Sequence, residues 1–305
     1  MGFLGGGNKA HSGGIYALCW NPDGSQVLTA SADKSCKLWD VVTQQVVSEF
    51  KMGTRIEDQQ IGCLWQGDNI LSLSVSGNIN YLDRNNPDKP LRILTGQNKN
   101  LKTLAVPPGS STIYCGSMDG RISYWDAVSG EVNLVGGVGH TNLVCSMTAT
   151  PENLYSLGFD KNLRKTPTDT NQYSSEVVPV PDRDPTYVAR SPDGLIMITT
   201  LTEIILVRDG KTIGSLPVSY QPLSAVFHPS RPEVAVGGKD SKVYIYTTEN
   251  DTLNLKNEIE TRGEVNAVDY DATGKFLAVS GYARIVNVYD TTSYEEVKSF
   301  IKQSA

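Results

Sequence analysis

The sequence predicts an all-β fold, a seven-bladed β-propeller, and three observations support it. First, short apolar runs end at points 38 to 43 residues apart, at Asp40, Asp83, Asp126, Pro167, Asp209, Thr247 and Asp290. Second, each interval contains alternating apolar residues interrupted by Pro, Asn, Asp and Gly clusters, which is typical of successive short antiparallel strands. Third, no stretch keeps the roughly 3.6-residue apolar period of a helix, so we expect almost no helix. A repeat of roughly 40–45 residues that closes with Trp-Asp is typical of a four-stranded propeller blade.

The first interval shows how the four strands follow one another. The apolar runs are GIYALCW (14–20), QVLTAS (26–31), CKLWD (36–40) and QQVVSEF (44–50), and the turns NPDG and ADKS separate the first three. Related turns recur along the chain as PPGS, SPDG, HPSRP and DATG. In three intervals the turn glycine lies 15 or 16 residues before the strand-end aspartate, as Gly24 does before Asp40. The spacing between the turn glycine and the strand-end aspartate is therefore nearly constant in these three intervals, which indicates a repeated structural unit.

Seven copies of this unit account for nearly all of the 305 residues. We expect a flexible N-terminus at 1–9, followed by repeats at 10–51, 52–95, 96–138, 139–180, 181–217, 218–260 and 261–302. One four-stranded blade cannot cover both of its own faces, so the blades must stack around an axis. Each predicted blade is contiguous in sequence, so a ring would close without a strand exchanged between the chain ends.

Composition argues against several functional classes. The formal net charge is -6, from 27 basic and 33 acidic residues without a basic block, which argues against nucleic-acid binding through phosphates. The five cysteines are an odd number at strand positions, and we expect buried free thiols in a reducing compartment. The first residues do not form a secretion signal, and no segment approaches the roughly 20 apolar residues of a membrane span. We therefore expect a protein of a reducing compartment without membrane insertion.

The most informative local motif is a set of four residues in the first repeat, His11, Ser31, Asp33 and Trp39. We predict that Asp33, in the tight turn between the second and third strands, hydrogen-bonds and orients His11. Ser31 and Trp39 would extend this network, which satisfies polar groups at the edge of the blade.

Parts of this motif recur, which favours a structural role over a catalytic one. The recurring pairs are Asp119 with Trp125, Asp240 with Tyr246, and His140 with Asp160. A His beside an Asp and a Ser is also the arrangement of a hydrolase, but a catalytic constellation occurs once in a chain. None of the three histidines lies at metal-ligand spacing with Cys or another His, and no phosphate-binding loop or nucleophile elbow is present. We predict no enzyme activity, no cofactor and no metal site.

The repeats resemble WD repeats, and one stretch closely resembles the actin-interacting protein 1 family. That stretch is DQQIGCLWQGDNILSLSVSGNINYLDRNNPDKPLRILTG (58–96). AHSGGIYALCWNPDGSQVLTASADKSCKLWD, GSMDGRISYWD, GHTNLV and VAVGGKDSKVYIY resemble the same family in the family's order, so the resemblance covers essentially the whole chain. It implies a cytoplasmic protein of the actin cytoskeleton that binds actin filaments. It also implies that the protein works with cofilin to disassemble filaments, by binding and without catalysis.

The chain differs from this family in length. Family members usually carry two seven-bladed propellers, whereas this chain has seven repeats. By resemblance, the first two repeats correspond to the last blades of the first propeller and the other five to the opening blades of the second. A family domain boundary would then lie near Gly96, and the alternative to one ring is a segment with two blades of one propeller and five of another. Because an open arrangement exposes edge strands, we expect a closed, monomeric ring.

Residues at the start of each innermost strand are the candidates for partner contacts, because no strand pattern demands their polar or aromatic character. They are Arg55, Glu57, Asp58, Lys99, Arg183, Asp184 and Tyr220. The alternative interpretation of function is a general WD-type scaffold that binds a different protein on the rim of the central channel.

Overall fold

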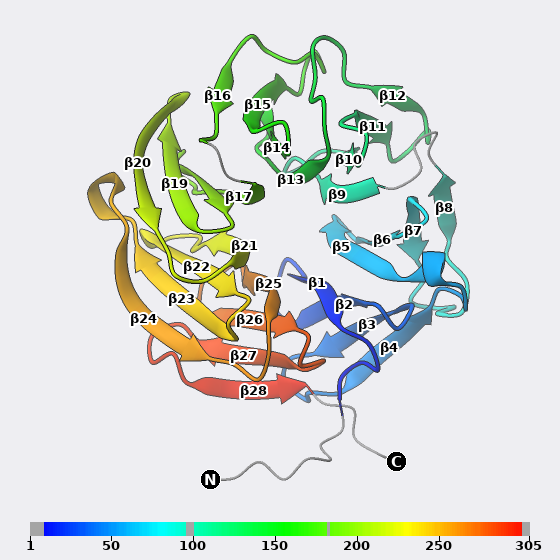
Figure 1. Ribbon diagram of the computed structural model, residues 1–305. Coiled ribbons are helices and arrows are strands. Elements are labelled where there is room, and N and C mark those ends of the chain that lie inside the picture. Colours follow the sequence, from blue (N-terminus) through cyan, green and yellow to red (C-terminus); the bar gives the residue numbers. More distant parts are fainter. Residues whose placement is uncertain (1–8, 96–100, 182–183, 301–305) are drawn as a thin grey trace.

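The computed structural model describes residues 9–95, 101–181 and 184–300, and in these ranges 28 strands form seven four-stranded antiparallel sheets. The sheets are the blades of one ring around a central axis (Figure 1). The predicted all-β, seven-bladed propeller is therefore confirmed, and the seven repeats are not divided between two propellers. The helices of the described ranges are two three-residue 3-10 helices, η1 (Ile56–Asp58) and η2 (Glu249–Asp251).

Each blade consists of four consecutive strands, with the first strand nearest the axis and the fourth at the outer wall (Figure 1). Blades 1 to 3 contain β1 (Ile15–Trp20), β2 (Gln26–Ser31), β3 (Ser35–Asp40), β4 (Val46–Lys51); β5 (Gln60–Gln66), β6 (Asn69–Ser74), β7 (Asn78–Leu82), β8 (Arg92–Thr95); β9 (Leu101–Ala105), β10 (Thr112–Ser117), β11 (Ile122–Asp126), β12 (Val132–Leu134). Blades 4 and 5 contain β13 (Val144–Ala149), β14 (Asn153–Gly158), β15 (Asn162–Pro167), β16 (Val177–Pro179); β17 (Pro185–Arg190), β18 (Ile196–Thr200), β19 (Glu203–Arg208), β20 (Lys211–Pro217). Blades 6 and 7 contain β21 (Pro222–Phe227), β22 (Glu233–Gly238), β23 (Lys242–Thr247), β24 (Asn254–Glu260); β25 (Val265–Tyr270), β26 (Phe276–Gly281), β27 (Val286–Asp290), β28 (Glu296–Phe300).

Three of the regularly spaced aspartates, Asp40, Asp126 and Asp290, end the third strand of a blade and cap the turn that follows it, whereas Asp83 and Asp209 lie directly after β7 and β19. Asp40 Oδ1 accepts hydrogen bonds from the backbone N–H groups of Val42 and Thr43, at 3.0 and 2.7 Å. Asp126 and Asp290 each accept the same two bonds from the second and third residues after them. These N–H donors hold the pKa of all three carboxyl groups below the usual range. In these three blades the strand-end position of the repeat is therefore a turn capped by a side chain.

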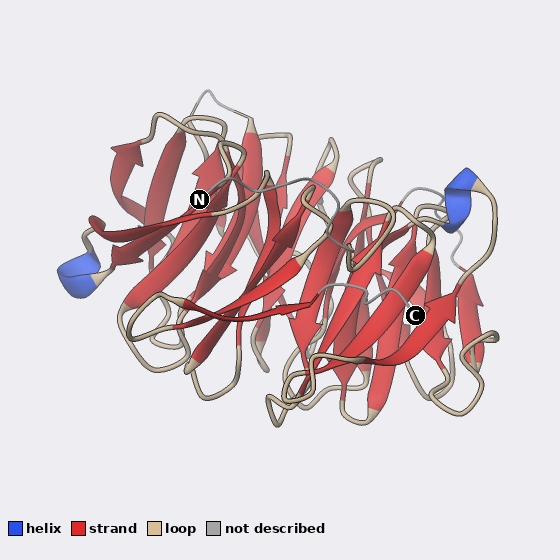
Figure 2. Cartoon of the chain, turned by 90° about the horizontal axis from the view of Figure 1, so that it is seen from below, coloured by secondary structure: helices blue, strands red, loops and turns tan. Residues whose placement is uncertain are grey.

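The turns between the first and second strands are also built from local contacts. In blade 1, Asn21 Oδ1 accepts a hydrogen bond from the Gln26 N–H at 2.8 Å. The turn glycines Gly24, Gly194 and Gly274 have φ values of +71°, +97° and +73°, a left-handed conformation that glycine adopts without steric cost. Figure 2 shows that the strands run between two faces made of such turns and loops. The two faces are where side chains not needed for packing are displayed.

Neighbouring blades pack sheet against sheet, and each contact between blades has its own cluster of buried apolar side chains. In the described residues there are seven such clusters for seven blades. A row of seven blades without closure has only six contacts between neighbours. The seventh cluster joins blade 7 to blade 1, so the ring is closed and every sheet is covered on both faces.

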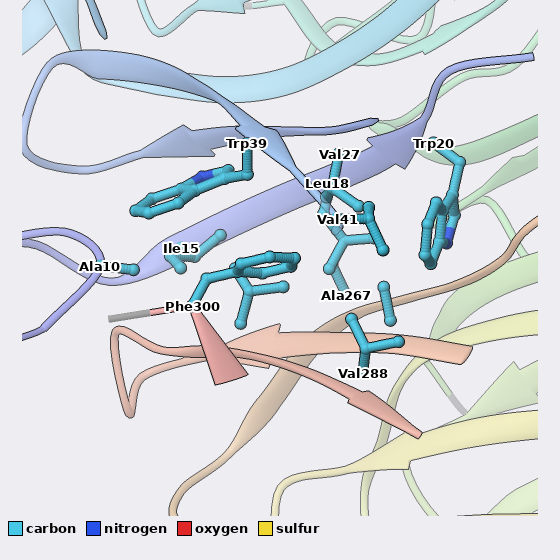
Figure 3. Packing of buried hydrophobic residues seen from close by; sticks show 12 residues of the cluster. Ala10, Ile15, Leu18, Trp20, Val27, Trp39, Val41, Ala267, Val288 and Phe300 are labelled. Atoms are coloured by element: carbon cyan, nitrogen blue, oxygen red, sulfur yellow. The ribbon is translucent and has the colours of Figure 1, made fainter. Parts of the chain in front are cut away.

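The contact between blades 1 and 7, here called the seam, unites the two ends of the described chain (Figure 3). The rings of Trp39 and Phe300 are both fully buried there, and their centroids are 5.6 Å apart. Ile15 and Val27 from blade 1 and Val288 from blade 7 fill the space around them (Figure 3). Burial of large aromatic and branched side chains stabilises the seam by the hydrophobic effect.

Hydrogen bonds complete the seam. Trp20 Nε1 donates to the backbone carbonyl of Asp269 at 3.0 Å, and the Trp20 backbone N–H donates to the Asp269 carboxyl at 3.3 Å. Asn266 Nδ2 donates to the Ile15 carbonyl at 3.3 Å. The described strands of blades 1 and 7 stay in separate sheets, so side-chain packing and these bonds close the ring in place of an exchanged strand.

Asp269 is partly buried in the seam, and its removal from water raises the pKa of its carboxyl to about 7, against the opposing effect of N–H donors from Trp20 and Tyr270. In the unfolded chain this carboxyl ionises near its ordinary pKa of 3.8. Between these two values the folded state binds more protons than the unfolded state, so stability falls as pH rises. Above about pH 7 the carboxyl is ionised in the folded state too, and the cost of its buried charge then lowers the free energy of unfolding in full.

We predict that Asp269→Asn stabilises the chain at neutral and alkaline pH, because the amide keeps an oxygen acceptor for the Trp20 N–H without a buried charge. The free energy of unfolding of the variant, minus that of the wild type, should rise by about 1–3 kcal/mol between pH 4 and pH 8. Urea unfolding of both proteins across this range measures the difference. A difference that does not change with pH would contradict the role assigned to this carboxyl.

Candidate functional site

A chain of hydrogen bonds in blade 1 links an imidazole, a carboxylate, a hydroxyl and an indole. His11 Nδ1 lies 2.8 Å from Asp33 Oδ2, and His11 Nε2 lies 2.7 Å from Thr29 Oγ1. Trp39 Nε1 donates to the same hydroxyl at 3.0 Å. These four residues come from the segment before β1, from β2, from the turn after β2 and from β3. The network therefore ties these four parts of one blade together.

The hydroxyl that joins the imidazole to the indole belongs to Thr29 and not to the predicted Ser31. Ser31 Oγ donates to the Gly14 carbonyl at 3.0 Å and accepts a bond from the Asp33 N–H at 3.1 Å. It therefore supports the turn after β2. Residues two apart in a strand share a face, so the sequence pattern alone does not distinguish these two hydroxyls.

The electrostatics of this network favour an ionised aspartate. Burial by itself raises the pKa of Asp33, but hydrogen bonds from His11 and Ser35 and the attraction of the imidazole outweigh burial and hold the pKa well below the usual range. Both ring nitrogens of His11 are engaged by other side chains. The imidazole thus has no free nitrogen with which to act on a substrate.

Blade 4 contains a shorter form of the same network. His140 Nδ1 lies 2.8 Å from Asp160 Oδ1, and His140 Nε2 lies 2.8 Å from Ser156 Oγ. Ser156 precedes its aspartate by four residues, as Thr29 does in blade 1. Thr166 stands where blade 1 has tryptophan, and its buried hydroxyl has no hydrogen-bond partner. The network in blade 4 therefore stops at the serine.

In blade 3 the predicted pair of aspartate and tryptophan is not joined. Asp119 accepts hydrogen bonds from the Ser117 hydroxyl and, at 3.2 Å, from the Arg121 N–H. Trp125 Nε1 donates to Ser123 Oγ at 3.3 Å. Within the described part of this blade, Asp119 stabilises the turn after β10, and Trp125 bonds to a neighbour in its own strand, β11.

In blade 6 a tyrosine takes the place of the histidine. Tyr220 precedes Asp240 by 20 residues, the spacing found in blade 4. Its ring stacks on Tyr244 with centroids 3.8 Å apart, and its hydroxyl lies 2.8 Å from that of Tyr246. The Tyr244 hydroxyl donates to Asp240 at 2.5 Å. Tyr220 is only 7% exposed, so it packs inside the blade instead of facing a partner.

The other contact candidates lie on the face where the innermost strands begin. Arg55, directly before η1, and Glu57, within it, are exposed, whereas the Asp58 carboxyl accepts the Arg55 N–H at 2.9 Å and caps that helix. Asp184 is exposed directly before β17. The structure describes neither Lys99 nor Arg183. Among the described candidates, Arg55, Glu57 and Asp184 therefore remain accessible to a partner.

The innermost strands also carry a feature that sequence analysis missed. In every blade the second residue of this strand is a β-bulge, unpaired with the neighbouring strand. The seven bulge residues are Tyr16, Ile61, Lys102, Cys145, Thr186, Leu223 and Asn266. All seven line the central channel, a cavity of about 620 Å³. A bulge changes the direction in which a side chain points. Here one side chain from each of the seven blades is directed toward the same axis.

The described residues offer no arrangement typical of metal catalysis, since no three His, Cys, Asp or Glu side chains converge as a metal site requires. The five cysteines are free thiols, and Cys36 and Cys115 are fully buried. Neither short helix in the described ranges has the length or apolar character to cross a membrane. The accessible features of the ring are therefore its channel, its two loop faces and the outer wall formed by the fourth strands.

We predict that Thr29→Val lowers the free energy of unfolding by about 1–3 kcal/mol, because it leaves His11 Nε2 and Trp39 Nε1 buried without a partner. Thr166→Val is the matched control: it makes the same change in a buried strand position whose hydroxyl is already unpartnered. The control should be neutral or stabilising. Denaturant unfolding of both variants measures the contrast, and equal losses would contradict the role assigned to the Thr29 hydroxyl.

Comparison with known proteins finds WD repeats in this chain. The WD domain, G-beta repeat family matches residues 7–40 and 88–126, and each match ends at the last residue of a third strand, β3 or β11. The crystal structure of RRP9 WD40 repeats has a TM-score of 0.81 at 17% identity, over 89% of this chain and 88% of that chain. The structure of U3-55K has a TM-score of 0.80 at 17% identity, over 89% of each chain. At this identity the likeness shows the fold alone.

Sequence relatives are similar over nearly the whole chain. WD repeat-containing protein 1 of Gallus gallus is 42% identical over 289 residues, which cover 93% of this chain and 48% of the relative. Actin-interacting protein 1 of Drosophila melanogaster is 39% identical over 289 residues, 95% of this chain and 48% of the relative. The chain spans about half the length of the curated relatives it matches. The chain therefore carries WD repeats on a seven-bladed propeller, and it is similar over nearly its whole length to WD repeat-containing protein 1 and actin-interacting protein 1.

Proposed function

We propose that this chain binds actin filaments and, together with cofilin, promotes their disassembly by binding alone. The observation that carries the proposal is 39% identity, over 95% of the chain, to a protein named actin-interacting protein 1. The aligned region covers 95% of the chain and so extends far beyond the two segments, 7–40 and 88–126, that the WD-repeat family matches.

The geometry supports binding more than catalysis. The two histidines that stand beside aspartates, His11 and His140, each have both ring nitrogens occupied by side chains of their own blade. A general base needs a nitrogen within reach of a substrate. The rigid ring presents loops on two faces, and loops held by a rigid scaffold are common sites of recognition.

Three further statements belong to this proposal. The chain acts in the cytoplasm on the actin cytoskeleton, its partners are actin filaments and cofilin, and it acts as a monomer. Monomeric action is supported by the closed ring, because each blade contact is used within one chain. The assignment of the seven repeats to two propellers of longer relatives, with a boundary near Gly96, is also a proposal, and Gly96 lies outside the described residues.

The alternative is a general WD-repeat scaffold with a different protein partner. The half-length match favours this alternative, because the half of each relative not represented here carries surface that this chain does not have. Pull-down with the chain as bait separates the two. Recovery of actin and cofilin supports the proposed function, whereas a different stoichiometric partner without either supports the alternative.

Co-sedimentation with actin filaments tests the proposal directly. We predict that the chain pellets with filaments that carry cofilin, and that it raises the actin left in the supernatant above the level with cofilin alone. The double charge reversal Arg55→Glu with Asp184→Lys should weaken this binding about threefold to tenfold, because both side chains are exposed on one face. Lys211→Glu, an exposed charge reversal on the opposite face, is the matched control.

Two outcomes would contradict the proposal in different ways. If the wild-type chain stays in the supernatant with bare and with cofilin-bearing filaments, this chain does not have the proposed function. If the wild type pellets and the double variant pellets equally well, the function stands but the face that includes Arg55 and Asp184 is not the filament contact.

A further inference from the structure

One face of the ring exposes apolar side chains at equivalent positions around the axis. The position directly after the second strand of a blade is occupied by Met118, Phe159, Leu201 and Tyr282 in blades 3, 4, 5 and 7. Their side chains are 55%, 37%, 38% and 56% exposed. Single exposed apolar residues are common and need no explanation. Four at one repeated position of one face form a pattern, here called the apolar rim.

The apolar rim borders the mouth of the channel. The Phe159 N–H donates to the Leu143 carbonyl at 2.8 Å, and the Tyr282 N–H donates to the Glu264 carbonyl at 3.1 Å. Each acceptor residue directly precedes an innermost strand. Tyr282 itself lines the channel. These turns are therefore attached to the segments from which the channel wall begins.

The channel wall below the rim has a single charge. Among the described residues that line it, Lys102 is the only one with a charged side chain, and it forms no ion pair with the residues that the structure describes. Burial raises the pKa of Cys145 and of Tyr187 in the wall to about 12, so both stay neutral at physiological pH. Lys102 is exposed at a bulge position, and its ammonium group thus has no counter-charge in the wall.

The opposite face is more acidic, whereas the face of the apolar rim exposes charges of both signs, such as Arg55 and Asp184. The turns of the opposite face expose many carboxylates, which include Asp23, Asp68, Glu131, Glu152, Asp169, Asp209, Glu249 and Glu295. Like charges across a contact suppress binding, and opposite charges guide it. An acidic segment is therefore repelled from that face and attracted to the mouth with Lys102.

We propose that the apolar rim and Lys102 together form a docking site for a short segment of a partner protein that carries apolar side chains next to a carboxylate. The apolar side chains pack on Met118, Phe159 and Leu201, and the carboxylate enters the mouth and pairs with the Lys102 ammonium. A charge-assisted bond in a partly desolvated mouth is stronger than one on an open surface. The proposal holds whether or not the partner is actin, so it does not rest on the function proposed above.

Selection from a phage-displayed library of random twelve-residue peptides, with the full chain as bait, tests this site. We predict that enriched peptides contain Asp or Glu within a few residues of Leu, Ile, Met or Phe. Fluorescence anisotropy then measures the affinity of a labelled enriched peptide. Lys102→Glu should weaken binding about tenfold or more, and the double variant Phe159→Ser with Leu201→Ser about fivefold or more. Lys211→Glu, on the acidic face, should leave the affinity unchanged.

A reciprocal exchange separates pairing from damage to the fold. Replacing the peptide carboxylate by lysine should abolish binding to the wild type and restore binding to Lys102→Glu. Thermal unfolding of each variant shows whether the ring is intact, and a rescue by the exchanged peptide demonstrates an intact site in any case. The proposal is overturned if no peptide is enriched, if enriched peptides lack acidic residues, or if Lys102→Glu binds the original peptide as tightly as the wild type.

Discussion

The fold depends on one constraint. Each four-stranded blade is apolar on both faces, so each of its two faces has to be covered by a neighbouring blade. A neighbour covers one face, and only a closed ring covers the remaining face of the first and last blades. The seam meets this requirement with Trp39 against Phe300 and with Trp20 bonded to Asp269. Removal of apolar surface from water is the main driving force for this packing, so the ring follows from the composition of the strands once there are enough blades to close.

The same constraint decides where function can lie. Because the sheet faces are used for packing, polar residues inside a blade, such as His11 with Asp33, serve to satisfy one another and are not free for chemistry. Side chains available to a partner are found on the two loop faces, on the outer wall of fourth strands and in the channel. There the seven bulges turn one residue per blade toward the axis, and Lys102 is the one among them that carries a charge. This placement is why recognition, and not catalysis, is the function that the geometry favours.

Much of the fold could be predicted from sequence because its signals are local. The strand-end aspartates and turn glycines cap and shape turns within a few residues of themselves, so they recur with the period of the blade. Closure of the ring could not be derived in this way, because Trp20 and Asp269 are 249 residues apart. Thr29 was missed since it shares a strand face with Ser31. Tyr220 lies in the predicted loop before β21, but it is buried and not available to a partner, and its spacing of 20 residues to Asp240, the spacing of the blade 4 histidine, was the signal for this. The bulges leave no mark in a single sequence, because they are defined by pairing with another strand.

Small-angle X-ray scattering of the monomer tests the central claim, that seven blades of one chain close into a single ring. A compact chain of this length has a radius of gyration of about 19 Å. A closed ring predicts a value close to this, with a pair-distance distribution that has one maximum. Two partial propellers, or a ring opened at the seam, would give a clearly larger radius and a distribution with a second maximum or a long tail, and that result would contradict the account.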